Sequence, residues 1–334
     1  MSRAAVVFPG RTSVTAASLG SLPPRHPWVR RADELRADLD LPSLASLDAE
    51  RFDPAIHRRA VHSWPLAFLA GLLDAERIAE DHEAVVVTGS STGWYTALAA
   101  TGVLPFDEAF RLVQRMAIAA DGPLPDGDAP AELVYPMIDD AWRTDPELEQ
   151  RVVAALDHDS DALFLALDMG AYAVLGGTSA AIQTRAAELI PVTLSGRSYP
   201  LRLPGADGWH TPLRAEAVRS AGAELQDLPW SVPSVTLVDG RGMRHTPWSA
   251  DPAAVAHYTL DEFGLVGFDV ATAVRVALRE HAPDVLLLPG PAGSLGAACA
   301  HLVIAEGYRG VRSRADFETA QRSDAPLLLS MRRR

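Results

Sequence analysis

The pattern of apolar and polar positions predicts an α/β core. Apolar runs at residues 4–10 and 84–88 are typical of buried strands, and each ends in a glycine-containing turn. Residues 63–80, 92–100 and 106–120 place apolar side chains at helical spacing. The same patterns continue later as mostly helix over 209–222, a strand at 234–238, a helix at 268–281 and a strand at 284–288. Strands that alternate with helices favour a parallel sheet.

A second pattern interrupts this alternation. Residues 121–130 form a linker rich in Pro, Gly and Asp. After it we expect a strand at 132–138, a helix at 145–157, strands at 162–167 and 171–176, a helix at 178–189 and a strand at 191–195. That βαββαβ order is typical of a ferredoxin-like unit. We therefore predict a main domain of residues 1–125 and 197–334, with residues 126–196 as an inserted ferredoxin-like subdomain.

Composition narrows the class of protein. The chain has 334 residues, of which 48% are hydrophobic, so it can bury a full core. Its net charge of −13 argues against nucleic-acid binding, and charged residues, Pro or Gly interrupt every apolar run before it could span a membrane. The N-terminal apolar stretch is too short for a secretory signal. Cys299 is alone, which argues against disulfides and a Cys-rich zinc site, so we expect a cytoplasmic protein without a metal.

The turn at residues 89–93 is the first candidate for chemistry. Its sequence, Gly-Ser-Ser-Thr-Gly, matches G-x-S-x-G with Ser91 at the centre, between a predicted strand and a predicted helix. Small flanking residues allow a sharp turn that exposes the central hydroxyl, and the helix N-terminus favours a developing oxyanion. The alternative is an ordinary helix cap, in which a serine accepts hydrogen bonds from first-turn amides. Ser90 lies off the centre of the motif and suits that structural role better.

A serine nucleophile requires a base, and His210 is the best placed of the ten histidines. It follows the loop Gly-Ala-Asp-Gly-Trp and directly precedes a predicted helix, so its ring can be held rigidly. Five other histidines lie in polar helical or loop-like segments and are expected on the surface: His57, His62, His158, His245 and His281.

Four segments together resemble the malonyl-CoA:acyl-carrier-protein transacylases and the acyltransferase domains of polyketide synthases. They are VVFPGRTS (6–13), TGSSTGWYTALAATGVLPFDEAFRLVQRM (88–116), WHTPLR (209–214) and LLLPGPAGSLGA (286–297). They are similar to that family's FPGQGSQ, GHSLGEYxALxxAG, HSPLM and ExGPxxxL elements, in the same order. The resemblance implies an α/β hydrolase-like core with a parallel sheet and an inserted ferredoxin-like subdomain.

The resemblance also implies an enzyme, an acyltransferase with a ping-pong mechanism. Ser91 would attack a thioester with His210 as general base, and the backbone amides of Thr92 and Arg11 would hold the oxyanion. Arg11 stands where the family has glutamine. No cofactor would be bound, because the substrates carry phosphopantetheine. The implied partners are an acyl-CoA or acyl-carrier-protein donor and an acyl carrier protein as acceptor, and a monomer is expected.

Departures from the family pattern concern the acyl pocket. Met116, 25 residues beyond Ser91, stands where malonyl-specific members have the arginine that binds the substrate carboxylate. Ser90 replaces a histidine, Trp209 lies in an altered segment before His210, and Gly267 aligns with a glutamine. A carboxylate buried beside methionine would be unpaired. We therefore expect transfer of a neutral or bulky acyl group in polyketide-type biosynthesis, and expect Met116→Arg to admit malonyl groups.

Three alternatives fit the same residues. The first is an editing hydrolase of the same fold, in which water replaces the second thiol. The second is an ordinary malonyl-CoA:acyl-carrier-protein transacylase with an unusual pocket. The third is a non-catalytic remnant that docks carrier proteins, against which the retained Ser91 and His210 argue.

Overall fold

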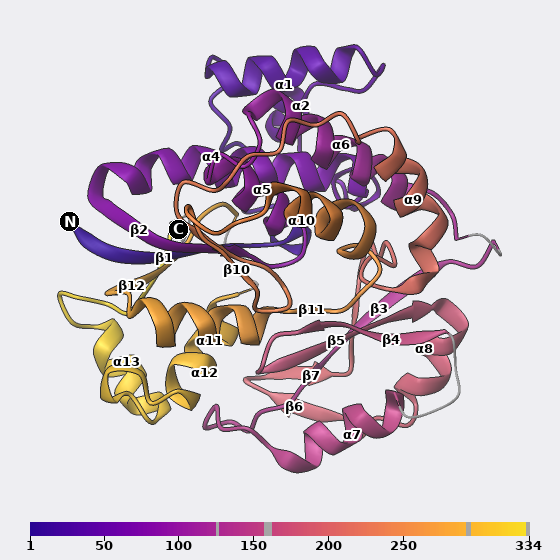
Figure 1. Cartoon of the computed structure of the whole chain (residues 1–334). Coiled ribbons are helices and arrows are strands. Elements are labelled where there is room, and N and C mark those ends of the chain that lie inside the picture. The colour runs from indigo at the N-terminus through magenta and orange to yellow at the C-terminus, as the bar shows by residue number, and fades with distance from the viewer. Residues whose placement is uncertain (125–126, 157–161, 292–294, 332–334) are drawn as a thin grey trace.

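A six-stranded, mainly parallel sheet forms the centre of the molecule (Figure 1). The computed structural model describes residues 1–124, 127–156, 162–291 and 295–331. The strand order is β10–β9–β2–β1–β12–β13, in which β10 is antiparallel to β9 and the other neighbours are parallel. The bounds are β1 (Ser2–Phe8), β2 (His82–Gly89), β9 (Thr236–Val238), β10 (Arg244–His245), β12 (Val285–Leu288) and β13 (Leu328–Ser330). The parallel core expected from the sequence is confirmed.

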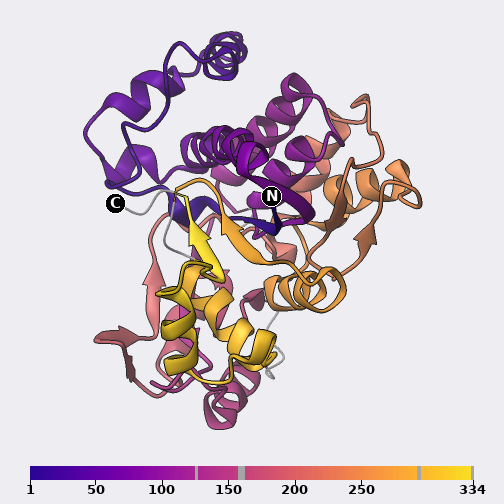
Figure 2. The same cartoon turned by 90° about the vertical axis from the view of Figure 1, so that its left-hand side faces the viewer.

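Helices cover both faces of this sheet, as Figures 1 and 2 show. One face carries α4 (Ala60–Asp81), α5 (Gly93–Ala100) and α6 (Phe106–Asp121), and the other carries α11 (Val270–His281), α12 (Gly296–Ala305) and α13 (Arg314–Gln321). The helices of the first group pack against one another, and α5 and α11 both contact β1 and β2. Burial of apolar helix stripes against a sheet is the usual origin of such a three-layer core.

The ferredoxin-like subdomain lies beside this core (Figure 1). Its sheet has the order β11–β4–β5–β3–β8. The elements are β3 (Pro130–Pro136), α7 (Pro146–Leu156), β4 (Leu163–Asp168), β5 (Tyr172–Thr178), α8 (Ser179–Ala186), β8 (Leu201–Leu203) and β11 (Phe268–Asp269). A separate two-stranded hairpin joins β6 (Val192–Leu194) to β7 (Arg197–Tyr199).

The subdomain extends beyond its predicted end at residue 196. The strand expected at 191–195 is β6, which pairs with β7 and not with the main sheet of the subdomain. The fourth strand of the βαββαβ unit is β8, which pairs with β3. The subdomain therefore continues to Leu203, and β11 from the later chain adds a fifth strand beside β4. Strands of two or three residues carry too little alternation to be recognised in a sequence.

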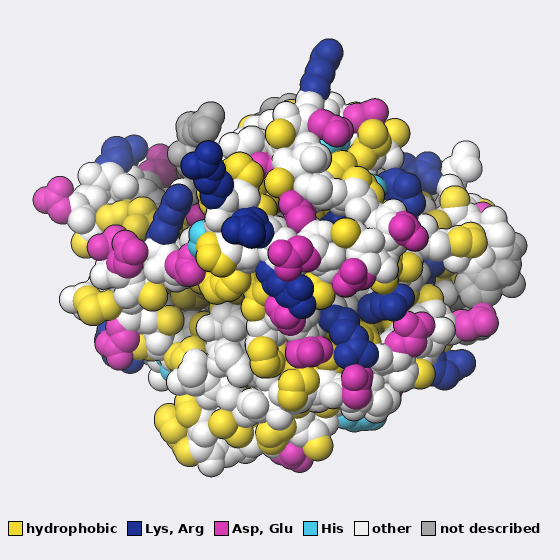
Figure 3. Space-filling view, turned by 90° about the horizontal axis from the view of Figure 1, so that it is seen from above, with side chains coloured by type: hydrophobic (Ala, Val, Ile, Leu, Met, Phe, Trp, Pro, Cys, Tyr) yellow, Lys and Arg dark blue, Asp and Glu magenta, His cyan; other side chains and the backbone are white. Residues whose placement is uncertain are grey.

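Further elements complete the main domain. They are α1 (Pro27–Ala37), α2 (Leu44–Ala49), α3 (Pro54–His57), α9 (Ala215–Ala223), α10 (Pro252–His257) and the short helical turns η1 (Arg11–Ser13), η2 (Pro212–Arg214), η3 (Tyr258–Glu262) and η4 (Tyr308–Gly310). On the face in Figure 3, basic and acidic side chains are interspersed. Ion pairs between neighbouring elements include Arg31 of α1 with Asp107 of α6, and Arg111 of α6 with Asp227. Within the described residues, no helix is long and apolar enough to cross a membrane.

Candidate active site

Two turns meet at the carboxyl edge of the parallel sheet. β1 and β2 are parallel neighbours, and their registers pair Phe8 with Gly89 at their last residues. The segments that follow these two residues therefore lie side by side. The Ser90 amide donates a hydrogen bond of 2.8 Å to the Phe8 carbonyl oxygen, which ties the two turns together. This pairing places the turn that carries Ser91 next to the turn that carries Arg11.

Close packing explains the glycines around Ser91. A Cβ atom on Gly89 would lie 2.1 Å from the carbonyl carbon of Gly93, and one on Gly93 would lie 2.3 Å from the Phe8 oxygen. Both distances are far below van der Waals contact, so neither position accepts a side chain without movement of the backbone. Ser91 itself has a φ of 52°, in the left-handed region that serine seldom adopts. The strand–turn–helix context expected for the G-x-S-x-G motif is present.

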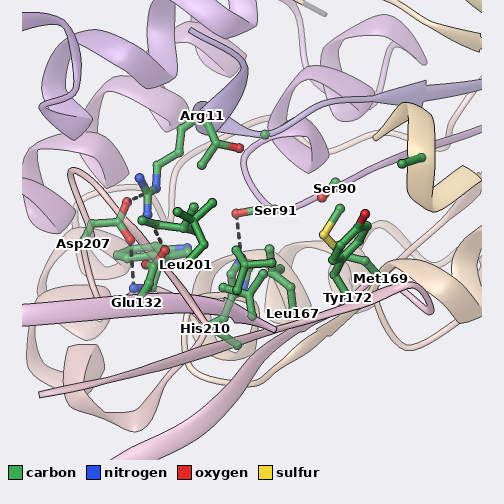
Figure 4. A pocket seen from close by; sticks show the side chains of 18 of the residues that line it. Arg11, Ser90, Ser91, Glu132, Leu167, Met169, Tyr172, Leu201, Asp207 and His210 are labelled. Carbon is green, nitrogen blue, oxygen red and sulfur yellow. Dashed lines mark hydrogen bonds and ion pairs between the residues drawn. The ribbon is translucent and has the colours of Figure 1, made fainter. Parts of the chain in front are cut away.

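His210 faces Ser91 from the opposite side of the site (Figure 4). Its Nε2 lies 2.9 Å from Ser91 Oγ, and its Nδ1 lies 2.9 Å from the Phe263 carbonyl oxygen. A carbonyl oxygen can only accept, so Nδ1 carries the proton and Nε2 is left to accept the Ser91 hydroxyl proton. The His210 amide donates to the Gly264 oxygen at 2.8 Å, which fixes the backbone as well. These distances fit the geometry that a nucleophile, its base and an orienting group require.

Burial keeps the imidazole neutral. It lowers the pKa of His210 to about 4, although the Phe263 carbonyl and the charge of Asp207 act in the opposite direction. At neutral pH the ring is therefore unprotonated and can accept the serine proton. By contrast, burial raises the pKa of the Cys299 thiol to about 12, so this cysteine lacks the thiolate that a nucleophile requires.

Helix N-termini supply candidate oxyanion donors. Thr92 is the N-cap residue of α5, and Arg11 is the first residue of η1. Gly10 lies so close to the serine turn that a Cβ on it would be 3.0 Å from the Ser90 oxygen. First-turn amides have no partner within their own helix and favour negative charge nearby. The two turns therefore bring the amides predicted from the sequence to the same edge of the sheet as Ser91.

A cavity of about 360 Å³ opens beside Ser91 and His210. One side comes from the turns of the main domain and includes Ser90, Arg11 and Trp209. The other side comes from the subdomain sheet and is largely apolar. Its lining residues from β3, β4, β5, β8 and the β4–β5 turn are Glu132, Val134, Ala166, Leu167, Met169, Tyr172, Val174, Leu201 and Leu203. Figure 4 shows Leu167, Met169, Tyr172 and Leu201 around Ser91 and His210.

Two residues predicted to shape the acyl pocket do not line this cavity among the residues that the structure describes. Met116 is fully buried on the inner side of α6 and is not among the described residues that line the cavity. Gly267 is exposed and is also not among the described residues that line the cavity. It packs closely on β4, because a Cβ on it would lie 2.4 Å from the Leu165 oxygen. The position of a residue relative to a cavity depends on tertiary packing, which counting along a motif does not include. The neighbouring Arg115 is partly exposed, and its guanidinium lies 3.5 Å from a Glu224 carboxylate oxygen.

A buried ion cluster beside the site was missed from the sequence. Arg11 Nε lies 2.7 Å from Asp207 Oδ2, Nη2 lies 2.7 Å from Glu132 Oε2, and Nη1 donates to the Gly205 oxygen at 2.7 Å (Figure 4). The family resemblance implied only a backbone role for Arg11. The two carboxylates lie far from Arg11 in the sequence, so no local motif joins them. The one signal in the sequence was Asp207, an acidic residue three positions before His210 that could pair with a cation near the site.

Other histidines correct the surface prediction. His57, His62 and His245 are buried, and each has a specific partner: the Leu47 oxygen, the Arg36 guanidinium and the Asp239 carboxylate, respectively. His281 is partly buried, and His158 lies outside the described residues. The buried rings make structural contacts, and none of them lines the cavity with Ser91. Polar neighbours in the sequence do not reveal which side of a helix faces the core.

Comparison with known proteins identifies the fold. No family model matches the chain, and no curated protein matches it in sequence. The structure is similar to the acyl carrier protein S-malonyltransferase of Vibrio cholerae, with 17% identity and a TM-score of 0.68 over 90% of this chain and 94% of that one. The malonyl-CoA:acyl carrier protein transacylase of Xanthomonas oryzae pv. oryzae matches with 21% identity and a TM-score of 0.73, over 90% and 92%.

A third match is the acyltransferase domain from the second module of the salinomycin polyketide synthase. It has 20% identity and a TM-score of 0.73 over 99% of this chain and 69% of that one. The chain therefore has the α/β fold of malonyl-CoA:acyl-carrier-protein transacylases and polyketide synthase acyltransferase domains, as the sequence motifs indicated.

Proposed function

We propose that this chain is an acyltransferase that carries an acyl group on Ser91 between two thiols. The observation that carries the proposal is the hydrogen-bonded series Ser91 Oγ, His210 Nε2, His210 Nδ1 and Phe263 O, with both links at 2.9 Å. The series lies at the wall of a cavity in a fold shared with acyl-carrier-protein transacylases. Such geometry supports attack of a serine on a thioester carbonyl.

The first half-reaction acylates the enzyme. Ser91 Oγ forms a bond to the thioester carbonyl carbon while its proton moves to His210 Nε2. The amides of Thr92 and Arg11 hold the negative oxygen of the tetrahedral intermediate. The carbon–sulfur bond then breaks, and the departing thiolate takes the proton from His210. The acyl-serine and a free thiol remain.

The second half-reaction reverses these roles. A phosphopantetheine thiol of an acyl carrier protein gives its proton to His210 and attacks the acyl-serine carbonyl. The ester bond breaks, and Ser91 Oγ recovers the proton from the imidazole. One solved structure of similar fold is a complex of a type II polyketide synthase acyl carrier protein with its malonyl-transacylase, with 18% identity and a TM-score of 0.72 over 90% of this chain and 93% of that one. It supports a carrier protein as the partner here.

The lining of the cavity favours a neutral acyl group. Leu167, Met169, Val174 and Leu201 present an apolar surface, and burial of a carboxylate against such a surface costs several kcal/mol, on the order of an unpaired buried charge. Each nitrogen of the Arg11 guanidinium already has an oxygen partner within 2.7 Å. A substrate carboxylate would therefore compete with Glu132 and Asp207 for that cation.

The remaining parts of the proposal concern context. The donor is an acyl-CoA or an acyl-carrier protein, the pathway is of polyketide type, and the enzyme acts in the cytoplasm as a monomer. It requires no bound cofactor, because the reacting thiols belong to the substrates.

A single-turnover experiment tests transfer. The protein is mixed with an octanoyl-acyl-carrier protein, with and without a second holo-acyl-carrier protein, and both carriers are followed by intact mass. We expect the octanoyl group to move to the acceptor carrier protein. When no acceptor is present, we expect it to remain on the donor carrier protein or on Ser91. Fast release as free acid without an acceptor would contradict transfer and favour the editing hydrolase. No movement and no acyl-serine would favour a non-catalytic protein.

A further inference from the structure

The Arg11 side chain joins three separate parts of the active site. The residue belongs to η1 at the end of β1, Glu132 belongs to β3 of the subdomain, and Asp207 belongs to the loop that leads to His210. The guanidinium contacts both carboxylates at 2.7 Å. All three side chains retain less than a tenth of their exposure, at 9% for Arg11, 6% for Glu132 and 5% for Asp207. These are buried ion pairs, for which loss of one partner leaves an uncompensated charge.

The Asp207 segment is held at several points. Asp207 Oδ1 accepts a hydrogen bond of 3.0 Å from the Trp209 amide, and the Asp207 carbonyl oxygen accepts one of 2.5 Å from Arg214 Nε. Arg11 Nη1 also donates to the Gly205 oxygen of the same loop. The residue that follows Trp209 is His210, whose φ of 62° lies in the left-handed region. A backbone in that conformation persists when its surroundings fix it.

We infer that Arg11 is a positioning residue, which fixes the oxyanion-hole turn relative to the loop that carries the general base. This inference rests on the proposed function. The amide of Arg11 lies in the turn beside Ser91, and its side chain holds the loop of His210 through Asp207 and Gly205. One residue therefore links two groups that must act on the same carbonyl. Glu132 binds the Arg11 guanidinium from β3, on the subdomain wall of the cavity.

The chemistry of arginine explains why this residue type suits the role. Its planar guanidinium presents donors in a fixed fork, so it can meet two carboxylates and a carbonyl oxygen at once. Lysine would supply the charge without the fork. Glutamine would supply one amide group and no charge, and it would leave Glu132 and Asp207 buried together without a cation.

The test measures how fast Ser91 reacts with a small fluorophosphonate, because this reaction requires the base and the oxyanion donors but no acyl pocket. We expect Arg11→Gln to lower the second-order labelling rate about 10- to 100-fold, the range that a misplacement near 1 Å produces. Arg11→Lys should recover part of this loss. Asp207→Asn should resemble Arg11→Gln, and Glu132→Gln, which keeps an acceptor for Arg11, should have a smaller effect.

Two controls separate positioning from a general loss of stability. Arg111→Gln removes the ion pair with Asp227 on the surface of α6, so it should leave the labelling rate unchanged. All variants are compared by thermal unfolding, and rates are taken per folded molecule. The double variant Arg11→Gln/Asp207→Asn should label about as slowly as either single variant, because both changes break one link.

The outcomes distinguish the two proposals. Two results would overturn the positioning role alone, provided that the wild type is labelled. The first is a folded Arg11→Gln variant whose labelling rate stays within twofold of the wild type. The second is a double variant in which the losses of the two single variants multiply. No labelling of wild type would contradict Ser91 as nucleophile and remove the positioning role with it. If Arg11→Gln does not fold, Asp207→Asn decides the question, since it preserves the size of the side chain.

Discussion

The two walls of the cavity are built on different principles. The wall from the parallel sheet holds Ser91, and its neighbours Gly89 and Gly93 have no room for a Cβ atom. The wall from the subdomain presents Leu167, Met169 and other apolar side chains, which line the cavity. Under the proposed function, the first wall would hold the reacting atoms, and the second would contact the acyl group. We therefore expect substitutions on the two walls to affect activity in different ways.

Replacement of the nucleophile should have the largest effect. Ser91→Ala removes the attacking oxygen, and we expect acyl transfer and fluorophosphonate labelling to fall by roughly 10⁴-fold or more. The matched control is Ser90→Ala, in the adjacent position, which should lower activity by less than about tenfold because Ser90 Oγ makes no bond to the acyl group. Intact-mass kinetics measure both. Retained labelling in Ser91→Ala would contradict the assignment.

A side chain at Gly89 should disrupt the turn that carries Ser91. Its Cβ would lie 2.1 Å from the Gly93 carbonyl carbon, so Gly89→Ala must displace the serine turn. We expect a loss of roughly 3 kcal/mol or more in the free energy of unfolding, together with loss of labelling. Gly296→Ala is the control, because a Cβ there meets no atom within 4 Å. Chemical denaturation compares the two, and equal stabilities would contradict the close packing.

Substitution at Met116 should affect stability and not specificity. The side chain is fully buried in α6 and lies outside the cavity lining, so Met116→Arg buries a guanidinium in the core. We expect a cost of about 3 kcal/mol or more in the free energy of unfolding and no gain of malonyl loading. This differs from the expectation drawn from the motif. Efficient malonyl loading by a stable Met116→Arg protein would restore the original interpretation.

A change in the subdomain wall should alter selectivity alone. Leu201→Trp narrows the cavity, and we expect about a tenfold loss of transfer for an octanoyl group against an acetyl group, a size typical of a crowded apolar pocket. Labelling by a small fluorophosphonate should change less than threefold, roughly the scale of a remote surface substitution. Val153→Trp, on the exposed face of α7, is the control. Equal losses for both acyl groups would show that the walls do not act separately.

A change of pH near neutrality should have the smallest effect on the labelling rate of Ser91. Because His210 must be neutral to accept a proton, and burial lowers its pKa to about 4, labelling should decline only as the pH falls through about 4. Between roughly pH 5.5 and 8 we expect less than a twofold change, since the imidazole is already unprotonated there. Thermal unfolding at each pH is the control. A decline centred near 6.5 would mean that the ring is exposed to solvent.

Local motifs predicted the first wall well. The G-x-S-x-G turn is a continuous segment between a strand and a helix, so Ser91 and the helix that follows could be placed from the sequence. His210 followed from its loop-to-helix position. The contact that orients it could not be predicted, because Phe263 contributes a backbone oxygen from 53 residues away. A main-chain acceptor leaves no side-chain signature in a sequence.

The second wall was harder to predict. The βαββαβ order was confirmed in outline, but β8, which carries the lining residues Leu201 and Leu203, was not expected. The Arg11 cluster joins residues separated by 121 positions and more, and such contacts exist only after both domains have folded. Gly267 and Met116 are not among the described residues that line the cavity, for a related reason. An offset from a motif gives the position along a chain and not the direction of a side chain.

A competition between two acyl donors for Ser91 tests the neutral-acyl assignment most directly. The protein is offered equal amounts of octanoyl-CoA and malonyl-CoA, and the acyl-enzyme is identified by intact mass and by peptide mapping of Ser91, before and after addition of a holo-acyl-carrier protein. We expect an octanoyl-serine that forms faster than the malonyl ester and then transfers to the carrier. Preferential loading of malonyl on Ser91 would contradict the neutral-acyl assignment.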